Sequence, residues 1–323
     1  VCSSDLANKK VTVIGTGNFG STVAFILAMN GICHEVVLRG RNIDVAKGKA
    51  LDMSQAANAA RQHTVVRAAK CAKDIAGSEV VVVTAGAPRT PGMDRDDLLL
   101  KNAEIVKGYA HEIKEHAPDS IVIVVSNPLD VMTYVMLKET GFPKERVLGM
   151  AGILDSARMA HFIYEKLEYG AGQIRATVMG GHGDTMVPLP KFTTVAGVPI
   201  EDLLNPDEIN EIVEKTKNGG AEIVNLLGDG SAYYAPAKST IVMVEAILRD
   251  TKQIHSCAVK LEGHYGHSDI VSGVPAMIGA NGIEKVIEMT LKPFQEDRFA
   301  KSVASVRELT EKLYELKFFE DKK

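Results

Sequence analysis

His182 has the residue type and the setting of a proton-transfer group. It stands in the run Gly181-His182-Gly183-Asp184, whose two glycines leave room for the backbone and the ring to approach a small molecule. An imidazole titrates near neutral pH, so it can donate a proton to a substrate oxygen or accept one from it. The chain has 9 histidines, so the motif, and not the residue type alone, selects this one.

Two charged side chains, Asp155 and Arg158, are three positions apart and would lie on one face of a helix. A guanidinium there could bind a substrate carboxylate through two parallel hydrogen bonds, which a lysine could not reproduce. Each residue also has a structural alternative. Arg158 could simply pair with Asp155, and Asp155 could cap a helix that begins at Ser156.

Two further arginines, Arg89 and Arg95, belong to a loop whose composition is typical of a hinged lid. Gly86 and Gly92 bound the loop and prolines interrupt it, which favours a lid over a helix. Closing such a lid would exclude water and bring cations onto an anionic substrate.

The run Gly15-Thr16-Gly17-Asn18-Phe19-Gly20 directly follows an expected strand and opens an expected helix. Its glycines permit a tight turn, close approach of a pyrophosphate and packing of the helix on the strand, and the helix N-terminus would face the anion. The run therefore predicts dinucleotide binding. The alternative is a turn that merely needs small residues.

The acidic residue that usually holds the adenosine ribose hydroxyls is missing after the second expected strand. Its place falls within Arg39-Gly40-Arg41-Asn42, where Gly40 supplies space and Arg41, together with Arg39, could pair with a 2′-phosphate. We therefore expect a preference for NADP(H) over NAD(H). The alternative is two solvated arginines at the end of a strand.

The first half of the chain predicts the scaffold that these groups need. Short β-branched runs alternate there with helical patterns, and each run is brief enough for a strand buried on both faces. Strands are expected at 11–14, 35–38, 80–84, 121–125 and 146–148, and helices at 21–29, 43–60, 96–116 and 131–140. This alternation predicts an α/β fold with a doubly wound parallel sheet of the Rossmann type.

The second half predicts a different, α+β domain. Strand-like runs at 173–179 and 258–261 mix with long helices, and Asn205-Pro206 forms a cap and first-turn proline for a helix over 207–227. We therefore expect a dinucleotide-binding domain over 1–149 and a substrate domain over 150–323. One buried face of a last helix is marked by Phe299, Val303, Val306, Leu309, Leu313 and Leu316.

Together these segments resemble the lactate/malate dehydrogenase family over nearly the whole chain, most closely its malate dehydrogenases of the lactate-dehydrogenase-like type. The resemblance implies that His182 is the acid/base and that Asp155 is its carboxylate partner. It implies that Arg95 polarises the substrate carbonyl, and that the amide of Asn127 touches both nicotinamide and substrate. Asn127 could instead be only a turn residue before Pro128.

The resemblance also implies the substrate, because the position of Arg89 selects it in this family and lactate enzymes have glutamine there. An arginine would pair with the second carboxylate of oxaloacetate, whereas the methyl group of pyruvate would leave a buried charge unmatched. We predict reversible hydride transfer between (S)-malate and oxaloacetate. The alternatives are a lactate or other 2-hydroxy-acid dehydrogenase and a non-catalytic dinucleotide-binding protein.

The resemblance further predicts a homodimer or homotetramer and an NAD(P) site. The segment 230–236 also matches a family stretch near the substrate, although its small residues could simply permit helix packing. The predicted cofactor contacts are Gly15, Gly17, Asn18, Phe19, Gly20, Gly40, Arg41, Thr84, Ala85, Gly86, Asn102, Val125 and Asn127.

Composition and charge argue against several other kinds of function. The formal net charge is −4 and no basic block stands out, which argues against nucleic acid as a partner. An uncharged run follows Lys9-Lys10, but glycine, asparagine, serine and threonine interrupt it, so we expect neither an export signal nor a membrane span. The 4 cysteines have neither zinc-ligand nor disulfide-framework spacing, so we expect reduced thiols, a cytoplasmic location and no metal.

Overall fold

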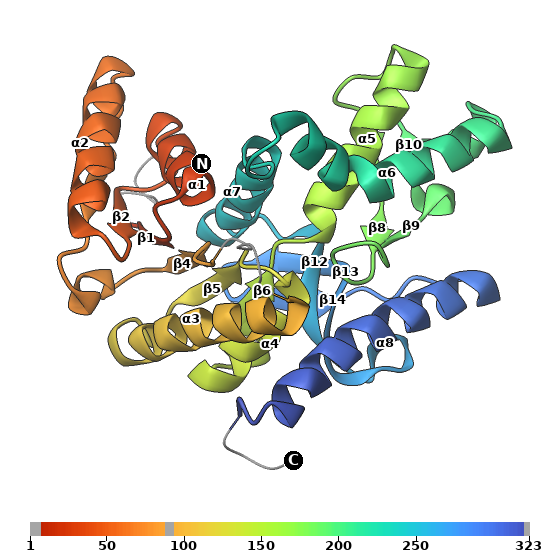
Figure 1. Ribbon diagram of the computed structural model, residues 1–323. Helices are drawn as coiled ribbons and strands as arrows, with labels where there is room; N and C mark the ends of the chain where they lie inside the picture. Colours follow the sequence, from red (N-terminus) through yellow and green to blue (C-terminus); the bar gives the residue numbers. More distant parts are fainter. Residues whose placement is uncertain (1–7, 88–93, 320–323) are drawn as a thin grey trace.

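A nine-stranded sheet runs through the middle of the computed structural model, which describes residues 8–87 and 94–319 (Figure 1). In spatial order its strands are β14 (Gly282–Val286), β13 (Ser268–Gly279), β12 (Gln253–Glu262), β6 (Val147–Gly149), β5 (Ile121–Val124), β4 (Val80–Val83), β1 (Lys10–Ile14), β2 (Glu35–Arg39) and β3 (Val65–Ala68). The strands from β1 to β6 pair in parallel, and those from β12 to β14 pair in antiparallel fashion. The order from β3 to β6 is that of a dinucleotide-binding sheet, so the predicted Rossmann fold is confirmed.

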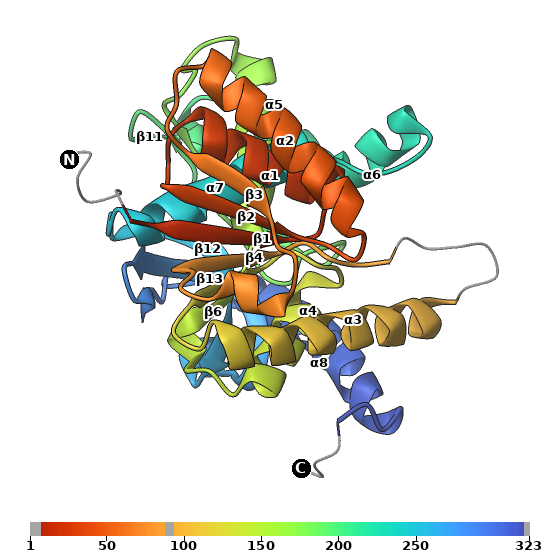
Figure 2. The same cartoon turned by 90° about the vertical axis from the view of Figure 1, so that its left-hand side faces the viewer.

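Helices cover both faces of this sheet (Figure 2). One face carries α1 (Asn18–Met29), α2 (Ile43–Ala59) and α7 (Tyr234–Leu248), and the other carries α3 (Arg95–His116), α4 (Leu129–Thr140) and α8 (Pro293–Glu315). This double cover explains why β4 is a run of four valines, all fully buried.

The parallel strands end at one common edge of the sheet, and this edge positions the candidate site. Ile14 of β1 pairs with Arg39 of β2 and with Val83 of β4, which in turn pairs with Val124 of β5. The loops that follow these four strands therefore emerge side by side, as expected for the ligand-binding edge of such a sheet.

In the described chain, the second half adds the longer antiparallel strands, two small sheets and, besides α7 and α8, two further α-helices. The helices are α5 (Gly152–Leu167) and α6 (Pro206–Leu227), and α6 has the predicted start, because Asn205 Oδ1 accepts the N–H groups of Asp207 and Glu208 at 3.0 Å. The small sheets are β7 (Ile174–Arg175) with β10 (Thr194–Val195) and β11 (Val198–Pro199), and β8 (Val178–Met179) with β9 (Val187–Pro188).

Several sequence expectations for the strands were wrong. The run 173–179 is not one strand: Thr177 turns away to bond Phe192 and Thr193, so β7 and β8 join different sheets. The edge strand β3 and the strands β13 and β14 were not predicted at all. The strand expected at 146–148 is displaced by one residue, since Arg146 ends a short 3₁₀ turn ahead of β6.

The helix expected from Ser156 begins four residues earlier, at Gly152. A Cβ at Gly152 would lie 2.6 Å from Ser256 Cβ and 2.8 Å from the Val178 carbonyl oxygen. This glycine therefore serves close packing of α5 on β12 and β8, a tertiary reason that local helix signals do not carry. In α8 the expected apolar face is mostly buried, but Leu316 caps the helix and is exposed.

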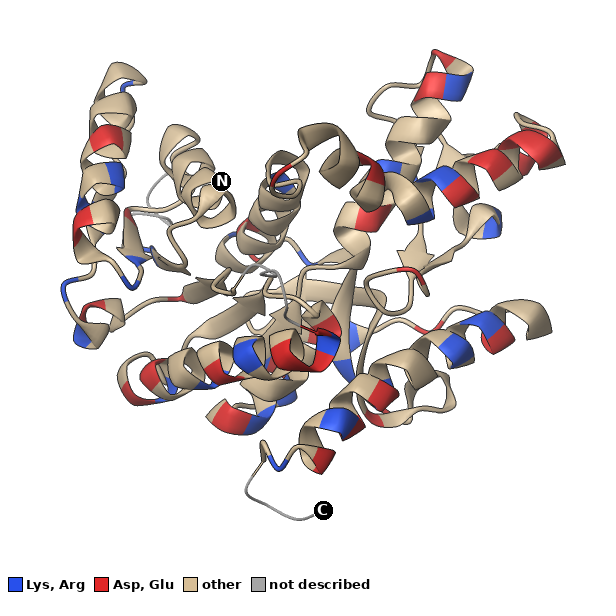
Figure 3. Cartoon of the chain, in the orientation of Figure 1, with Lys and Arg blue, Asp and Glu red and all other residues tan. Residues whose placement is uncertain are grey.

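Charged residues of both signs occur along the same helices, as on α3 and α8 (Figure 3). No helix of the part that the structure describes is long and apolar enough to cross a membrane. Cys33, Cys71 and Cys257 are free thiols.

Candidate active site

The loop between β1 and α1 is built around close glycine contacts. Gly15 has φ +112°, and an added Cβ would lie 2.3 Å from Thr84 Oγ1, while one at Gly20 would lie 1.9 Å from the Gly15 carbonyl oxygen. By contrast, no described atom lies within 4 Å of a Cβ built on Gly17, where α1 begins without a side-chain cap. The helix N-terminus thus keeps N–H groups for an anion beside open space, which fits a pyrophosphate.

A cavity of about 460 Å³ lies against this loop. It is lined by most of the predicted cofactor contacts, namely Gly15, Gly17, Asn18, Phe19, Gly20, Gly40, Arg41, Thr84, Ala85 and Gly86. The lining also includes Ile105 and Tyr109 of α3, which sequence reasoning missed although both follow Asn102 at helical spacing. Residues 230–233 line it too.

Three predicted cofactor contacts are not among the residues lining this cavity. Asn102 instead ties two loops together, since its Oδ1 accepts the Ala87 N–H at 2.7 Å and its Nδ2 donates to the Asn127 carbonyl oxygen at 2.9 Å. Val125 is buried and donates its N–H to the Val83 carbonyl oxygen at 2.8 Å. The side chain of Asn127 is exposed between β5 and α4.

Arg39, the last residue of β2, and the two residues that follow it have different environments. Arg39 is not a free cation, because its Nε and Nη2 donate to the two carboxylate oxygens of Glu112 at 3.1 and 2.9 Å. The expectation that Arg39 could assist Arg41 is therefore wrong. Arg41 lines the cavity, and a Cβ on Gly40 would lie 2.7 Å from Thr16 Cγ2 in the phosphate-binding loop.

His182 and Asp155 are brought together from positions 27 residues apart. His182 Nδ1 lies 2.9 Å from Asp155 Oδ2, the long-range contact that the resemblance predicted. Asp155 is 1% exposed and lies inside the first turn of α5, so the alternative that it caps this helix is wrong. The His182 side chain stays 19% exposed, which leaves the ring accessible to a substrate.

Opposing effects set the proton affinity of His182. Burial lowers the pKa of the imidazole, whereas the charge and hydrogen bond of Asp155 and the charge of Asp130 raise it, and Arg158 lowers it. The net effect raises the pKa above 6.5. Because Asp155 faces Nδ1, the other ring nitrogen is free to exchange a proton with a substrate oxygen.

Arg158 stands beside this pair. Its Nη1 lies 3.4 Å from Asp155 Oδ1, so the predicted structural pairing exists, although this distance is long for a hydrogen bond. Its Nε is buried and has no hydrogen-bond partner among the described residues. A Cβ built on Gly220 of α6 would lie 3.5 Å from both terminal nitrogens, in ordinary van der Waals contact, so α6 passes beside the guanidinium.

A cleft of about 510 Å³ joins His182 to Arg95, and Pro128 and Asp130 are among its lining residues. Arg95 is the first residue of α3 and follows the capping Asp94, whose carboxylate accepts the Asp97 N–H at 2.7 Å. The expectation that Arg95 belongs to a non-helical lid is therefore wrong. Arg89 lies outside the described residues.

Sequence reasoning missed Asp130, a buried carboxylate whose Oδ2 accepts the main-chain N–H of His182 at 2.8 Å. Asp130 lies two residues after Pro128, in the first turn of α4, where an acidic residue is common because it interacts favourably with the helix N-terminus. Its sequence position alone therefore did not single it out. Within the described ranges, no group of three His, Cys, Asp or Glu residues could hold a metal ion.

Comparison with known proteins agrees with this geometry. Residues 9–149 match the family model described as lactate/malate dehydrogenase, NAD binding domain, and residues 153–317 match its alpha/beta C-terminal domain. The chain is 64% identical to a malate dehydrogenase of Sulfurimonas denitrificans, over 97% of this chain and 98% of that protein. It is 60% identical to one of Nitratiruptor, over 98% and 99%.

Solved structures give the same result. The malate dehydrogenase of Salinibacter ruber superposes with a TM-score of 0.91 at 45% identity, over 95% of this chain and 98% of that one. Family models match both halves of the chain, and full-length relatives share more than half of its residues. The chain belongs to the lactate/malate dehydrogenase family.

Proposed function

We propose that this protein catalyses reversible hydride transfer between (S)-malate and oxaloacetate with a nicotinamide cofactor. The observation that carries the proposal is the His182–Asp155 pair, which has Arg158 beside it and shares a cleft with Arg95. The names of the relatives at 64% and 60% identity support the choice of malate.

The cofactor would supply the hydride, and each protein residue has its own task. His182 donates its proton to the carbonyl oxygen as oxaloacetate is reduced, and it takes the proton back as malate is oxidised. Asp155 holds the ring and balances the charge of the imidazolium. Arg158 binds the C1 carboxylate, and Arg95 polarises the carbonyl group.

The residues around the phosphate-binding loop fit a dinucleotide. The close contacts of Gly15 and Gly20 leave no room for side chains, and the start of α1 is open at Gly17. Asn127 adds an amide where the loops after β4 and β5 meet, and we propose that it contacts both nicotinamide and substrate.

The second carboxylate of oxaloacetate is assigned to Arg89. This assignment rests on the sequence, because an arginine there matches a diacid and leaves a charge unmatched with pyruvate. Arg89→Gln should shift preference toward pyruvate. Unchanged turnover of oxaloacetate by that variant would contradict the assignment.

The deciding experiment crosses two substrates with two cofactors. Reduction of oxaloacetate and of pyruvate is measured with NADPH and with NADH, and we expect kcat/KM to favour oxaloacetate by a factor on the order of 10⁴. Comparable turnover of pyruvate would favour the lactate alternative. Failure to turn over either acid would favour the non-catalytic alternative.

We further propose a preference for NADP(H). A side chain at position 40 would press on Thr16, so the carboxylate that holds ribose hydroxyls has no room there, while Arg41 lines the cavity. A second cation lies at the phosphate-binding loop, where Lys49 Nζ donates to the Thr16 carbonyl oxygen at 2.6 Å and to Ser21 Oγ at 2.9 Å. The alternative is that Arg41 is only solvated.

Arg41→Ser tests this preference, with Lys47→Ser on the exposed side of α2 as a control that removes the same charge. We expect kcat/KM with NADPH to fall about tenfold or more in the first variant and to stay within about twofold with NADH. An equal loss with both cofactors, or none, would contradict the proposal. The control should behave as the wild type does.

We also propose that residues 1–149 hold the cofactor and residues 150–323 supply the acid/base pair. From the family resemblance we also propose a homodimer or homotetramer. A cytoplasmic location rests on the free thiols at Cys33, Cys71 and Cys257.

A further inference from the structure

The main chain on the N-terminal side of the imidazole is fixed by two acceptors of different kinds. Ser302 Oγ, from α8, accepts the Gly181 N–H at 2.8 Å. Asp130 Oδ2, from α4, accepts the His182 N–H at the same distance. Both acceptors are buried, and they serve neighbouring peptide groups, so the chief difference between them is that one is neutral and the other can carry a charge.

The charged acceptor is the more costly of the two. Asp130 is 4% exposed, and its second oxygen, Oδ1, is buried without a hydrogen-bond partner among the described residues. A hydroxyl would hold the N–H equally well without burying an unmatched charge. The hydrogen bond to the main-chain N–H of His182 therefore does not by itself explain why the residue at this position is a carboxylate.

The negative charge of Asp130 acts on a titratable group in the same site, the imidazole of His182. His182 faces the carboxylates of Asp155 and Asp130 and the guanidinium of Arg158, and all three influence its protonation. Arg95 of α3, Asp184 of the loop after His182, and Glu308 of α8 line the same cleft. Of the acidic groups, Asp155 and Asp130 hydrogen-bond to His182 itself, one to its ring and one to its main chain.

We propose that Asp130 is a positioning residue for proton transfer: its carboxylate fixes the main chain of His182 and places a second negative charge beside the imidazolium. Asp155 orients the ring through Nδ1, and Asp130 orients the peptide from which the ring projects. The imidazole therefore stays protonated to higher pH than Asp155 alone would permit. This inference rests on the proposed role of His182 as the acid/base.

The test compares Asp130→Asn with Ser302→Ala. Asparagine keeps an oxygen that can accept the His182 N–H but removes the charge, whereas Ser302→Ala removes a neutral acceptor from the adjoining peptide. The measurement is the pH profile of kcat/KM for oxaloacetate reduction, whose alkaline limb reports the protonated imidazole.

For Asp130→Asn we expect this limb to move down by about one pH unit, as the loss of one nearby charge predicts. Burial raises the pKa of Asp130 itself to about 6, so the two profiles should converge below that pH, where the wild-type carboxyl is also neutral. Ser302→Ala should lower kcat without moving the limb. An unmoved limb in Asp130→Asn, or equal shifts in both variants, would overturn the proposal.

Two further measurements keep the outcomes separate. If Asp130→Asn does not fold, wild-type protein with ¹³C-labelled aspartate carboxyls is titrated, and a protonated Asp130 at pH 8 would overturn the proposal. If the wild type does not reduce oxaloacetate, the proposed function fails. If it does and the limb is unmoved, only the role of Asp130 fails.

Discussion

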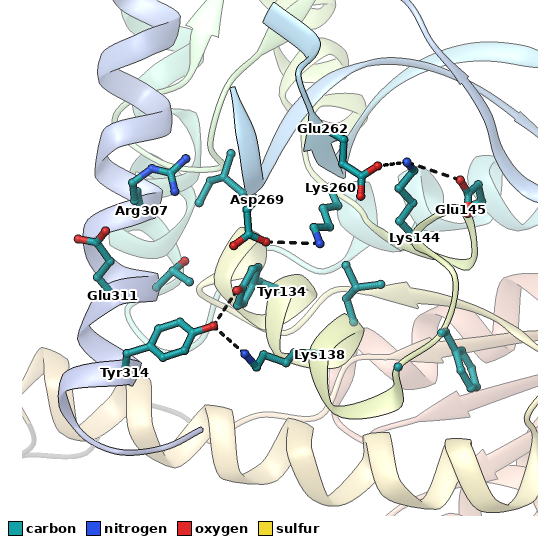
Figure 4. A pocket seen from close by; sticks show the side chains of 15 residues that line it. Tyr134, Lys138, Lys144, Glu145, Lys260, Glu262, Asp269, Arg307, Glu311 and Tyr314 are labelled. Carbon is teal, nitrogen blue, oxygen red and sulfur yellow. Dashed lines mark hydrogen bonds and ion pairs between the residues drawn. The ribbon is translucent and has the colours of Figure 1, made fainter. Parts of the chain in front are cut away.

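Two concave regions of this molecule contain charged side chains and differ in how far these charges are paired. The groove between α4, α8 and the β12–β13 hairpin encloses about 960 Å³, compared with about 510 Å³ for the cleft at His182. In the groove, most of the charged side chains that the picture labels are paired with one another (Figure 4). Lys144 pairs with Glu262 and Glu145, and Lys260 lies 3.4 Å from Asp269.

The cleft and its surroundings leave charges unmatched. Four buried side-chain atoms lack a hydrogen-bond partner in the described chain, and the two that belong to charged groups, Asp130 Oδ1 and Arg158 Nε, are both beside His182. Buried polar groups are normally paired, so unpaired ones need an explanation, and a reacting site provides it. Unmatched charge thus points to the candidate active site better than the size of the cavity does.

The largest expected effect comes from removing the imidazole. His182→Gln should lower kcat for oxaloacetate reduction by about 10²- to 10⁴-fold, because general acid catalysis is lost. Lys144→Met, in the larger groove, should change kcat by less than about twofold, since surface ion pairs contribute little. Steady-state kinetics on the two variants tests the comparison, and a comparable loss in both would break it.

The wild type also has a defined pH dependence in this reaction. The pKa of His182 is raised, so the protonated form that reduction needs is present below that pKa and disappears as the pH rises through it. Malate oxidation needs the neutral ring and should increase over the same range. Limbs of opposite direction are therefore expected when kcat/KM for oxaloacetate reduction and for malate oxidation is measured against pH, and limbs of the same direction would contradict this.

The next effect concerns stability, because an unmatched buried carboxylate is costly once it is ionised. The folded-state pKa of Asp130 is about 6, above its ordinary 3.8, so protonation favours the folded state and this advantage is lost as the pH rises from about 4 to above 6. The free energy of unfolding of Asp130→Asn, minus that of the wild type, should therefore rise by about 3 kcal/mol between pH 4 and 8. Urea unfolding at fixed protein concentration measures it, and a constant difference would contradict the expectation.

A smaller loss is expected when only the shape of a cation changes. Arg158→Lys keeps the charge but removes the planar fork, so kcat/KM for oxaloacetate should fall by about 10- to 100-fold. Arg307→Lys in the groove is the matched control, because Arg307 donates only to the Ser268 carbonyl oxygen among the described residues. Equal losses in both variants would show that the fork at Arg158 has no special role.

Local sequence patterns predicted the scaffold because each pattern reports on its own segment. A run of buried valines, or a glycine turn before the first helix, can be recognised from residues that are close together in the sequence. These patterns therefore predicted the parallel sheet and the phosphate-binding loop. The pair of Asp155 with His182 needed the family resemblance, since 27 residues separate its members.

Contacts between distant segments could not be predicted in this way. Arg39 was expected at a phosphate but is held by Glu112, 73 residues away, and Asp130 meets a main-chain group 52 residues away. The sequence alone does not distinguish Arg39 from Arg41, which have the same charge and are two positions apart. The environment that separates them exists only once α3 has packed beside β2.

The smallest expected effect is the stability of the groove itself. The Lys144 side chain is 36% exposed, and its bond to Glu262 raises the pKa of the lysine and lowers that of the glutamate. The pair should therefore contribute at neutral pH and be lost as the pH falls through the lowered pKa of Glu262 or rises through the raised pKa of Lys144. Because solvent screens so exposed a pair, Lys144→Met should reduce the free energy of unfolding by about 1 kcal/mol or less, and the loss should vanish in 1 M salt. A loss of several kcal/mol that persists in salt would mean that the groove, like the cleft, depends on buried charge, and the contrast between the two regions would no longer hold.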